Sequence, residues 1–272
     1  MTHVRTSPES ASSRASGWRP LHRHAHLVGF VLCTLLAIGG SAAAHGPHDH
    51  SGGIAAPEGE VEVVDVDIVH AKIVTEGNVA TFHMAVSGKA GATRPTPVGT
   101  LAGSSVFAYV WPTTIDSYEV GFEASAGILA LAVTAHPDFD DTPLFDENGD
   151  GDPTNDGDVW HSHWVVLGPD EQCGVGALKV IDIPEGSQPR LPKTWPGLPL
   201  LIDSPGWQPL FYAETVEVNV PFDDISVVEG ASYDGVTAGL LVNANLHAPL
   251  LCVVDVFDVA SGELSLPGRP NQ

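Results

Sequence analysis

The sequence predicts an all-β protein, an antiparallel β-sandwich or jelly-roll with long acidic and proline-rich loops. Three observations support this class. Valine-rich segments in which apolar and polar residues alternate recur after residue 60, as in half-buried strands. Glycine, proline, asparagine and aspartate separate these segments, as in sandwiches with short turns. No long stretch has the periodicity of an amphipathic helix.

The first 44 residues are expected to form a secretory signal peptide. A basic segment precedes the 12-residue apolar run Leu27–Ile38, and small residues follow it up to Ala44. The run is shorter than the roughly 20 residues that span a bilayer. We therefore expect cleavage after Ala44, a periplasmic or secreted location, and no stable membrane insertion afterwards. A retained N-terminal anchor is the alternative.

Residues 45–59 are expected to form a flexible, histidine-rich tail ahead of a single β-sandwich domain over 60–272. Cleavage after Ala44 would make His45 the N-terminal residue, and its amino group and imidazole can together chelate copper. His48 and His50 follow closely. The tail is therefore a candidate collector of copper or zinc, and the alternative is weak chelation by a disordered segment.

The expected strands are separated by two long loops. Residues 137–158 hold nine acidic residues and no basic one, and residues 184–209 hold seven prolines. Segments this poor in strand character are expected to be ordered loops or a functional lid. Strands are expected over residues 61–74, 79–87, 105–111, 117–122, 127–135, 159–168, 177–183, 214–220, 235–247 and 251–259.

The acidic loop contains a candidate calcium site. Asp146, Asn148, Asp150 and Asp152 alternate with other residues in a D-x-N-x-D-G spacing, which places oxygen ligands around one centre. Over about a dozen residues this loop resembles the calcium loops of EF-hands and dockerins. The resemblance implies Ca²⁺ bound by these four side chains. The alternative is a solvated acidic turn.

The calcium loop departs from the EF-hand pattern at its end. Its twelfth position is Gly157, where EF-hands have a bidentate glutamate. Asp156 or Asp158 would have to supply the last carboxylate. The resemblance therefore covers the loop and not the EF-hand fold.

A second candidate metal site has histidine nitrogens as ligands in place of carboxylate oxygens. His161 and His163 are two apart on an expected strand and share one face, a spacing found in zinc, copper and iron sites. A further ligand is expected from His136, which precedes the acidic loop, or from His247. The alternative is histidines satisfied by hydrogen bonds to carbonyls or carboxylates.

Other histidines and the cysteines receive structural interpretations. His70 and His83 are expected to be surface residues without partners. Cys173 and Cys252 are the only cysteines after the leader, and in an oxidising compartment they are expected to form a disulfide. Two unpaired buried thiols are the alternative.

The net charge of the chain restricts the classes of molecule that it is expected to bind. Without its leader the chain has 7 basic and 33 acidic side chains, a formal net charge of −26. Such a surface repels nucleic acid and anionic lipid headgroups and attracts divalent metal ions. The chain contains no P-loop, no nucleophile elbow and no dinucleotide-binding glycine motif, which makes an enzyme less expected than a binding protein.

The sequence therefore predicts an exported metal-binding protein, stabilised by calcium, that serves in metal handling. The first alternative is a non-catalytic module that recognises a carbohydrate or a surface partner through Trp195, Trp207 and Tyr212. The second is a metal-dependent oxygenase or hydrolase at His161 and His163.

Overall fold

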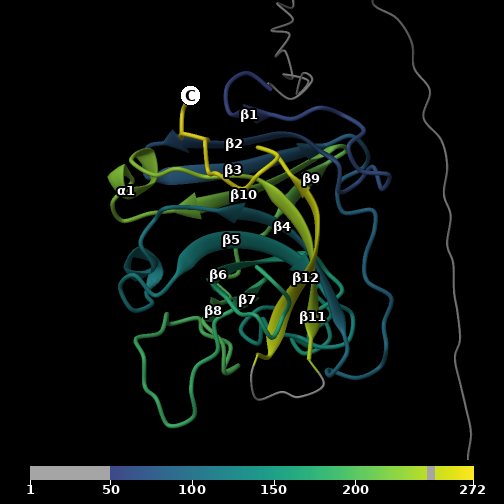
Figure 1. Ribbon diagram of the computed structural model, residues 1–272. Coiled ribbons are helices and arrows are strands. Elements are labelled where there is room, and N and C mark those ends of the chain that lie inside the picture. Colours follow the sequence, from purple (N-terminus) through teal and green to yellow (C-terminus); the bar gives the residue numbers. More distant parts are fainter. Residues whose placement is uncertain (1–49, 244–248) are drawn as a thin grey trace, which may run out of the picture. The chain divides into compact units, whose positions relative to one another are not determined.

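The computed structural model describes residues 50–243 and 249–272, all of them within the unit His45–Gln272. Nearly all of the regular secondary structure in the described residues is antiparallel strand (Figure 1), which confirms the predicted all-β class. The signal-peptide range 1–44 and the candidate ligands His45, His48 and His247 lie outside the described residues. Within the described part of the chain, no helix has the length and apolar character needed to cross a bilayer.

The first sheet has the strand order β1-β2-β3-β10-β9. A tight turn at Gly77, whose φ of 61° suits glycine, joins its two long neighbouring strands β2 and β3. The short strand β1 lies within the range expected to be a tail. The strands are β1 (Ile54–Ala55), β2 (Ile68–Glu76), β3 (Val79–Val86), β9 (Leu210–Tyr212) and β10 (Thr215–Pro221).

The second sheet closes on itself. Its order is β5-β4-β11-β12-β7-β6-β8, and β5 also pairs with β6, so β4, β5, β6, β7, β12 and β11 form a closed barrel. Strand β8 pairs with β6 beside the barrel. The strands are β4 (Ser105–Pro112), β5 (Ile128–Ala135), β6 (His161–Pro169), β7 (Leu178–Val180), β8 (Ile202–Asp203), β11 (Val236–Val242) and β12 (Leu251–Val259).

Strand alternation divides the apolar residues between two cores. The first core lies between the first sheet and the outer face of β4, β5 and β6, and it contains the bulky aromatic residues, with Trp164 packed edge-on against Phe82 at 5.8 Å. The second core lines the barrel interior with aliphatic side chains and no aromatic ring among its fully buried members, as at Val106 and Ala108. The barrel interior therefore has less side-chain volume than the layer outside it.

One predicted strand is wrong. Residues 117–122 do not pair with a strand, and η1 (Ser117–Val120) is a 3₁₀ turn. The Asp116 carboxylate accepts the N–H of Tyr118, and Gly121 ends the turn with φ 109°. These local hydrogen bonds compete successfully with strand pairing.

Other boundaries also differ from the expectation. The strand predicted over 61–74 begins only at Ile68, because the Asp67 carboxylate accepts the N–H groups of Gly59 and Val61 and folds the preceding segment into turns. The proline-rich segment 184–209 includes the short strand β8. A single helical turn, α1 (Ser226–Glu229), precedes β11.

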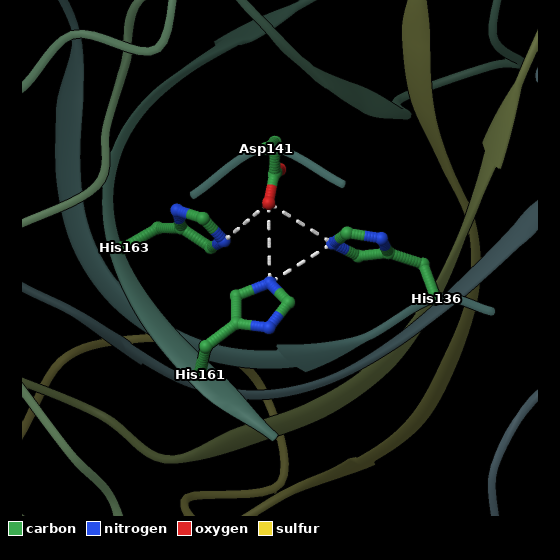
Figure 2. A group of neighbouring side chains, drawn as sticks. All are labelled: His136, Asp141, His161 and His163. Atoms are coloured by element: carbon green, nitrogen blue, oxygen red, sulfur yellow. Dashed lines mark hydrogen bonds and ion pairs between the residues drawn. The ribbon is translucent and has the colours of Figure 1, made fainter. Parts of the chain in front are cut away.

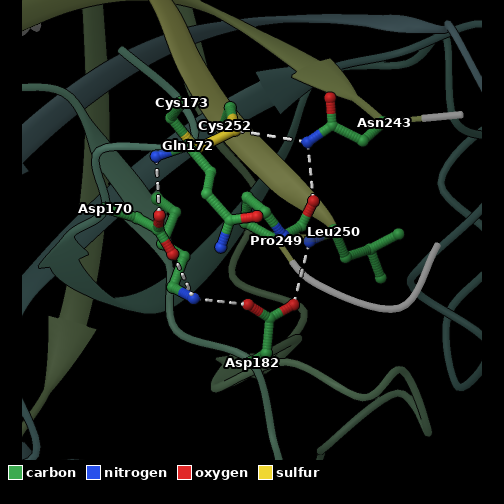
Figure 3. The surroundings of a disulfide bond; sticks show 9 residues. Asp170, Gln172, Cys173, Asp182, Asn243, Pro249, Leu250 and Cys252 are labelled. Carbon is green, nitrogen blue, oxygen red and sulfur yellow. Dashed lines mark hydrogen bonds and ion pairs between the residues drawn. A yellow bond between two sulfur atoms is a disulfide. The ribbon is translucent and has the colours of Figure 1, made fainter. Parts of the chain in front are cut away.

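A disulfide closes the narrowest seam of the barrel (Figure 3). It joins Cys173, in the loop before β7, to Cys252 on β12, with Cα atoms 5.4 Å apart. Strands β7 and β12 meet at one register pair, Cys252 with Lys179. The Lys179 ammonium lies 2.8 Å from the carboxylates of both Asp170 and Asp182. The cross-link and these ion pairs hold the seam, and the prediction of a disulfide is confirmed.

Replacing both cysteines with alanine should lower the free energy of unfolding. The disulfide closes a loop of 79 residues, and the chain-entropy model assigns such a loop about 4 kcal/mol. Denaturant unfolding under oxidising conditions measures the loss. Wild-type protein reduced with dithiothreitol is the control and should match the double variant. Coincident unfolding curves for the oxidised wild type and the variant would contradict a stabilising role.

Candidate metal centre

Pairing between β5 and β6 brings three histidines to one end of the barrel. Thr134 is opposite His161 and Ala132 is opposite His163, and His136 follows the last residue of β5. His163 faces the barrel interior, and His161 shares that face because side chains two apart on a strand point the same way. The register of the two strands thus joins histidines that are far apart in the sequence.

The acidic loop supplies a fourth side chain, Asp141. The loop returns to the barrel where the His136 N–H donates to the carbonyl of Gly157 at 2.6 Å. A Cβ at Gly157 would collide with the carbonyl oxygen of Phe139, so only glycine permits this close approach. The returning loop places Asp141 over the end of the barrel.

The four side chains point at one centre (Figure 2). The Asp141 Oδ1 atom lies 3.2 Å from the Nε2 atom of each of His136, His161 and His163. The Nε2 atoms of His136 and His161 are 3.0 Å apart. All four side chains are at most 5% exposed. The centre is therefore compact and almost entirely shielded from bulk water.

Hydrogen bonds to the backbone fix the tautomer of two of the three imidazoles. The His136 Nδ1–H donates to the carbonyl of Phe139 at 2.9 Å, and the His161 Nδ1–H donates to that of Val159 at 2.7 Å. Carbonyl oxygens only accept hydrogen bonds, so both Nδ1 atoms carry protons. The Nε2 atoms of the neutral rings then carry lone pairs, and the Thr134 Oγ1 atom lies within hydrogen-bond distance of His161 Nε2, at 3.1 Å.

His163 is oriented through Ser204. The Ser204 hydroxyl donates to the backbone carbonyl of Asp141 at 2.6 Å, so its oxygen accepts from His163 Nδ1 at 3.1 Å. The carbonyl of Asp203 lies 3.3 Å from the same nitrogen. A third Nε2 lone pair is thereby turned toward Asp141.

The arrangement leaves polar atoms unsatisfied. Neither Asp141 Oδ1 nor His163 Nε2 has a hydrogen-bond partner, although both are buried. Burial would raise the pKa of Asp141, but positive charge on the rings of His163 and His136, with hydrogen bonds from His136 and His161, holds this pKa well below its usual range. A buried carboxylate among three imidazoles needs positive charge at the centre, which either a proton on one ring or a bound metal ion could supply.

The donor geometry fits a first-row transition metal. Bonds of about 2.0–2.1 Å from such an ion to nitrogen and oxygen place neighbouring donor atoms roughly 3.0–3.4 Å apart. The observed separations of 3.0 and 3.2 Å fall in this range. Three imidazoles and one carboxylate suit zinc, copper or iron. His136, Asp141, His161 and His163 thus form a group that could hold one metal ion.

Of the histidine ligands expected for a transition metal, the structure brings together His136, His161 and His163. Asp141 was missed. Its only sequence signal is its position in the acidic loop, five residues after His136. His50, from the expected tail, instead stacks on His70 at 5.0 Å, with His83 nearby on β3.

The prediction that His70 and His83 are surface residues is wrong. Both are 1% exposed. They lie on the adjacent strands β2 and β3, with ring centroids 5.6 Å apart. The His83 Nδ1 atom is 2.8 Å from the Glu217 carboxylate, and the His70 Nε2–H donates to the carbonyl of Gly52 at 2.6 Å. Hydrogen-bond partners on distant segments permit the burial of both histidines, and the sequence alone does not indicate that these segments come together.

The residues expected to bind calcium occupy an exposed turn. The Asp146 carboxylate accepts the N–H groups of Gly149, Asp150 and Gly151. In this turn Asn148 and Asp150 likewise accept backbone N–H groups further along the loop. Asp152 and Asp158 are also exposed. These hydrogen bonds define the turn. Many of its side-chain oxygens point to backbone N–H groups of the same turn.

A different set of carboxylates converges in the same loop. Asp140, Glu147 and Asp156 each offer an oxygen within 4.8 Å of the others. Asp156 is fully buried, and its Oδ1 and the Oε1 of Glu147 have no hydrogen-bond partner. Burial raises the pKa of Glu147, and the charge of Asp140 adds to this effect. Of the predicted calcium ligands, Asp156 belongs to this group.

A cavity of about 170 Å³ adjoins the histidine centre inside the barrel. His136, Asp141 and His163 border it, and apolar side chains form nearly all of its remaining wall. The centre is thus shielded from bulk water but open to the cavity inside the barrel.

Comparison of the chain with protein-family models, with curated proteins and with solved structures finds no match. The fold and the site therefore define only a class, an all-β protein with a candidate metal centre.

Glu147→Gln should stabilise the metal-free protein at neutral pH. Because the folded state raises the pKa of this carboxyl, the ionised form costs stability as the pH rises above about 4.3, the usual unfolded value. The variant removes that cost, so its advantage in melting temperature should be present at pH 7 and vanish near pH 4. Melting of chelator-treated protein across this range measures it, with exposed Glu171→Gln as control. Parallel curves for wild type and variant would contradict the assignment.

Proposed function

We propose that this protein holds one divalent transition-metal ion on His136, Asp141, His161 and His163. The convergence of three Nε2 lone pairs on one buried carboxylate oxygen carries this proposal. Their Nδ1 hydrogen bonds orient the rings before an ion binds, as in established metal sites. Zinc, copper and iron are the ions that this donor set favours.

The burial of the ligands favours a resident ion over one in transit. Metal handling, the role that the sequence suggested first, requires ligands that a donor or acceptor protein can reach. Here every ligand side chain is at most 5% exposed. The ion would leave either by opening of the acidic loop or through the barrel cavity, whose apolar wall opposes passage of an ion, so we propose slow exchange. The tail at His45, His48 and His50 stays a separate prediction of a copper or zinc collector.

Export to the periplasm or exterior is part of the proposal. The leader-like segment up to Ala44 supports it, and so does the disulfide between Cys173 and Cys252, which is typical of oxidising compartments.

A metal-dependent oxygenase or hydrolase is the second candidate function. The cavity favours it, because an apolar space that borders three of the four metal ligands gives a small molecule access to the ion. Four protein ligands leave coordination positions open on a five- or six-coordinate ion, and such an ion can polarise a bound oxygen or activate water.

The alternative function, recognition of a carbohydrate or surface partner, has less support than metal binding. Trp195 and Trp207 are half-buried, and Trp207 packs edge-on against Trp164 with ring centroids 6.2 Å apart. The Trp195 Nε1–H donates to the carbonyl of Leu200 at 3.2 Å. Tyr212 is the more exposed of the three proposed stacking residues, at 46%. A flat aromatic platform for a sugar would need more of these rings to be accessible.

We also propose that the acidic loop binds a calcium ion, centred on Asp140, Glu147 and Asp156. Three carboxylates with two unsatisfied buried oxygens are better suited to a hard cation than to a transition metal. The neighbouring Asp140 and Asp141 would then link the two sites, since calcium would fix the loop that carries Asp141.

Elemental analysis tests the transition-metal site. Untagged protein expressed with its leader should contain about one zinc, copper or iron ion per chain. The double variant His161→Ala/His163→Ala should lose this ion, while Ser162→Ala, between the two ligands, should keep it. Refolded metal-free protein should bind Co²⁺ with the same dependence on these residues. Wild type that lacks metal and ignores added Co²⁺, Zn²⁺ and Cu²⁺ would refute the site.

Thermal melting tests the calcium proposal. Millimolar Ca²⁺ should raise the melting temperature of the wild type because it binds only the folded loop. Asp156→Asn should abolish this rise and Asp150→Asn should preserve it. The reverse pattern would place calcium on the exposed turn around Asp146, and no shift in the wild type would remove calcium from the loop.

A further inference from the structure

The cavity of the barrel is a consequence of its small inward-facing residues. Val106, Ala108 and Val110 face inward on β4, as do Ala132 on β5 and Ala238 on β11. Protein interiors are normally packed with few voids larger than a water molecule. A space of about 170 Å³ with an almost wholly apolar wall is therefore unusual.

The size and chemistry of the cavity define a class of ligand. An apolar cavity of about 150 Å³ stays dry and accommodates benzene. The barrel cavity is slightly larger and has polar groups at one end only, where Thr134, His136, Asp141 and His163 border it. A molecule with a compact apolar body and one polar end would match both parts of the wall.

The cavity reaches the surface away from the histidines. Strand register places Val236 and Val259 at the end of the barrel away from His136. Beyond this end the C-terminal segment contributes Leu264 and Leu266 to the cavity wall. Leu264 is 36% exposed, so the cavity borders solvent here.

The residues at this opening have a strained backbone. Leu264 and Leu266 both have φ of 51°, a left-handed conformation that leucine rarely adopts. Backbone strain of this kind concentrates at ligand clamps and switch regions.

We propose that the barrel binds a small aromatic or similarly compact apolar molecule, whose single polar atom meets the metal ion beside His136, Asp141 and His163. The cavity would act as the substrate or ligand site of the second candidate function, and this inference rests on the proposed metal site. The apolar wall selects against sugars, amino acids and other molecules with several polar groups, because their hydrogen-bonding groups would be left unpaired.

Phenol and toluene serve as probes of the full-length protein without its leader, loaded with Co²⁺. Phenol should raise the melting temperature and change the visible absorption spectrum of the bound Co²⁺. Toluene should raise the melting temperature without changing the spectrum, because it has no atom that can bind the ion. Glycerol at the same concentration should do neither.

Cavity variants separate specific binding from general solvent effects. Ala238→Leu fills the space from β11, far from the ligand strands, and should weaken phenol and toluene binding at least tenfold while still binding Co²⁺. Val110→Thr, which adds a hydroxyl to the wall with little change in volume, should weaken toluene binding and serves if Ala238→Leu does not fold. Val254→Leu, on the exposed face of β12, is the matched control and should behave as wild type.

The outcomes distinguish the two proposals. Wild type that binds Co²⁺ but responds to neither probe, or equal responses in Ala238→Leu, would overturn the cavity inference alone. A shift in melting with phenol but an unchanged spectrum would overturn the contact with the ion. Failure to bind Co²⁺ would refute the metal site, whereas toluene binding to that metal-free protein would still support the cavity.

Discussion

The repulsion between acceptor atoms at the end of the barrel is the constraint on which the proposed function depends. One carboxylate oxygen lies 3.2 Å from each of three imidazole nitrogens, and each ring donates its Nδ1 proton away from the centre. No lysine or arginine forms an ion pair with Asp141 among the described residues. A cation from outside the chain would contact all four atoms at once, whereas a proton on one imidazole would pair only that ring with the Asp141 carboxylate.

Packing on the outside of the barrel explains how its strands can be stable around a cavity. Large aromatic side chains such as Trp111 and Trp164 lie outside the barrel and form a dense core with the first sheet. That core supports β4, β5 and β6 from their outer face. The inner face can then carry valine and alanine and leave a cavity, because the stability of these strands does not depend on filling it. Structural support and the candidate site are thus on opposite faces of the same strands.

The acidic loop connects the two proposed ions. It begins at the end of β5, carries Asp140 and Asp141 side by side, and returns to the barrel at Gly157. Asp140 faces the carboxylate group and Asp141 faces the histidines. An ion that ordered the loop would therefore fix one ligand of the other site. The concentration of negative charge in this loop, unfavourable for folding by itself, would have the role of attracting the proposed calcium ion.

The sequence by itself determined the class of fold and three of the four side chains in the candidate metal centre. Alternation of apolar and polar residues is a local property, so it identified most strands and placed His161 and His163 on one face. Local patterns failed where side chains satisfied the backbone, as Asp116 does in the 3₁₀ turn that replaces a predicted strand. Tertiary structure alone decided that β5 pairs with β6, that the sheet closes, and that Asp141 completes the centre. Those facts depend on strand register and loop path, which join residues distant in the chain and have no periodic signature in it.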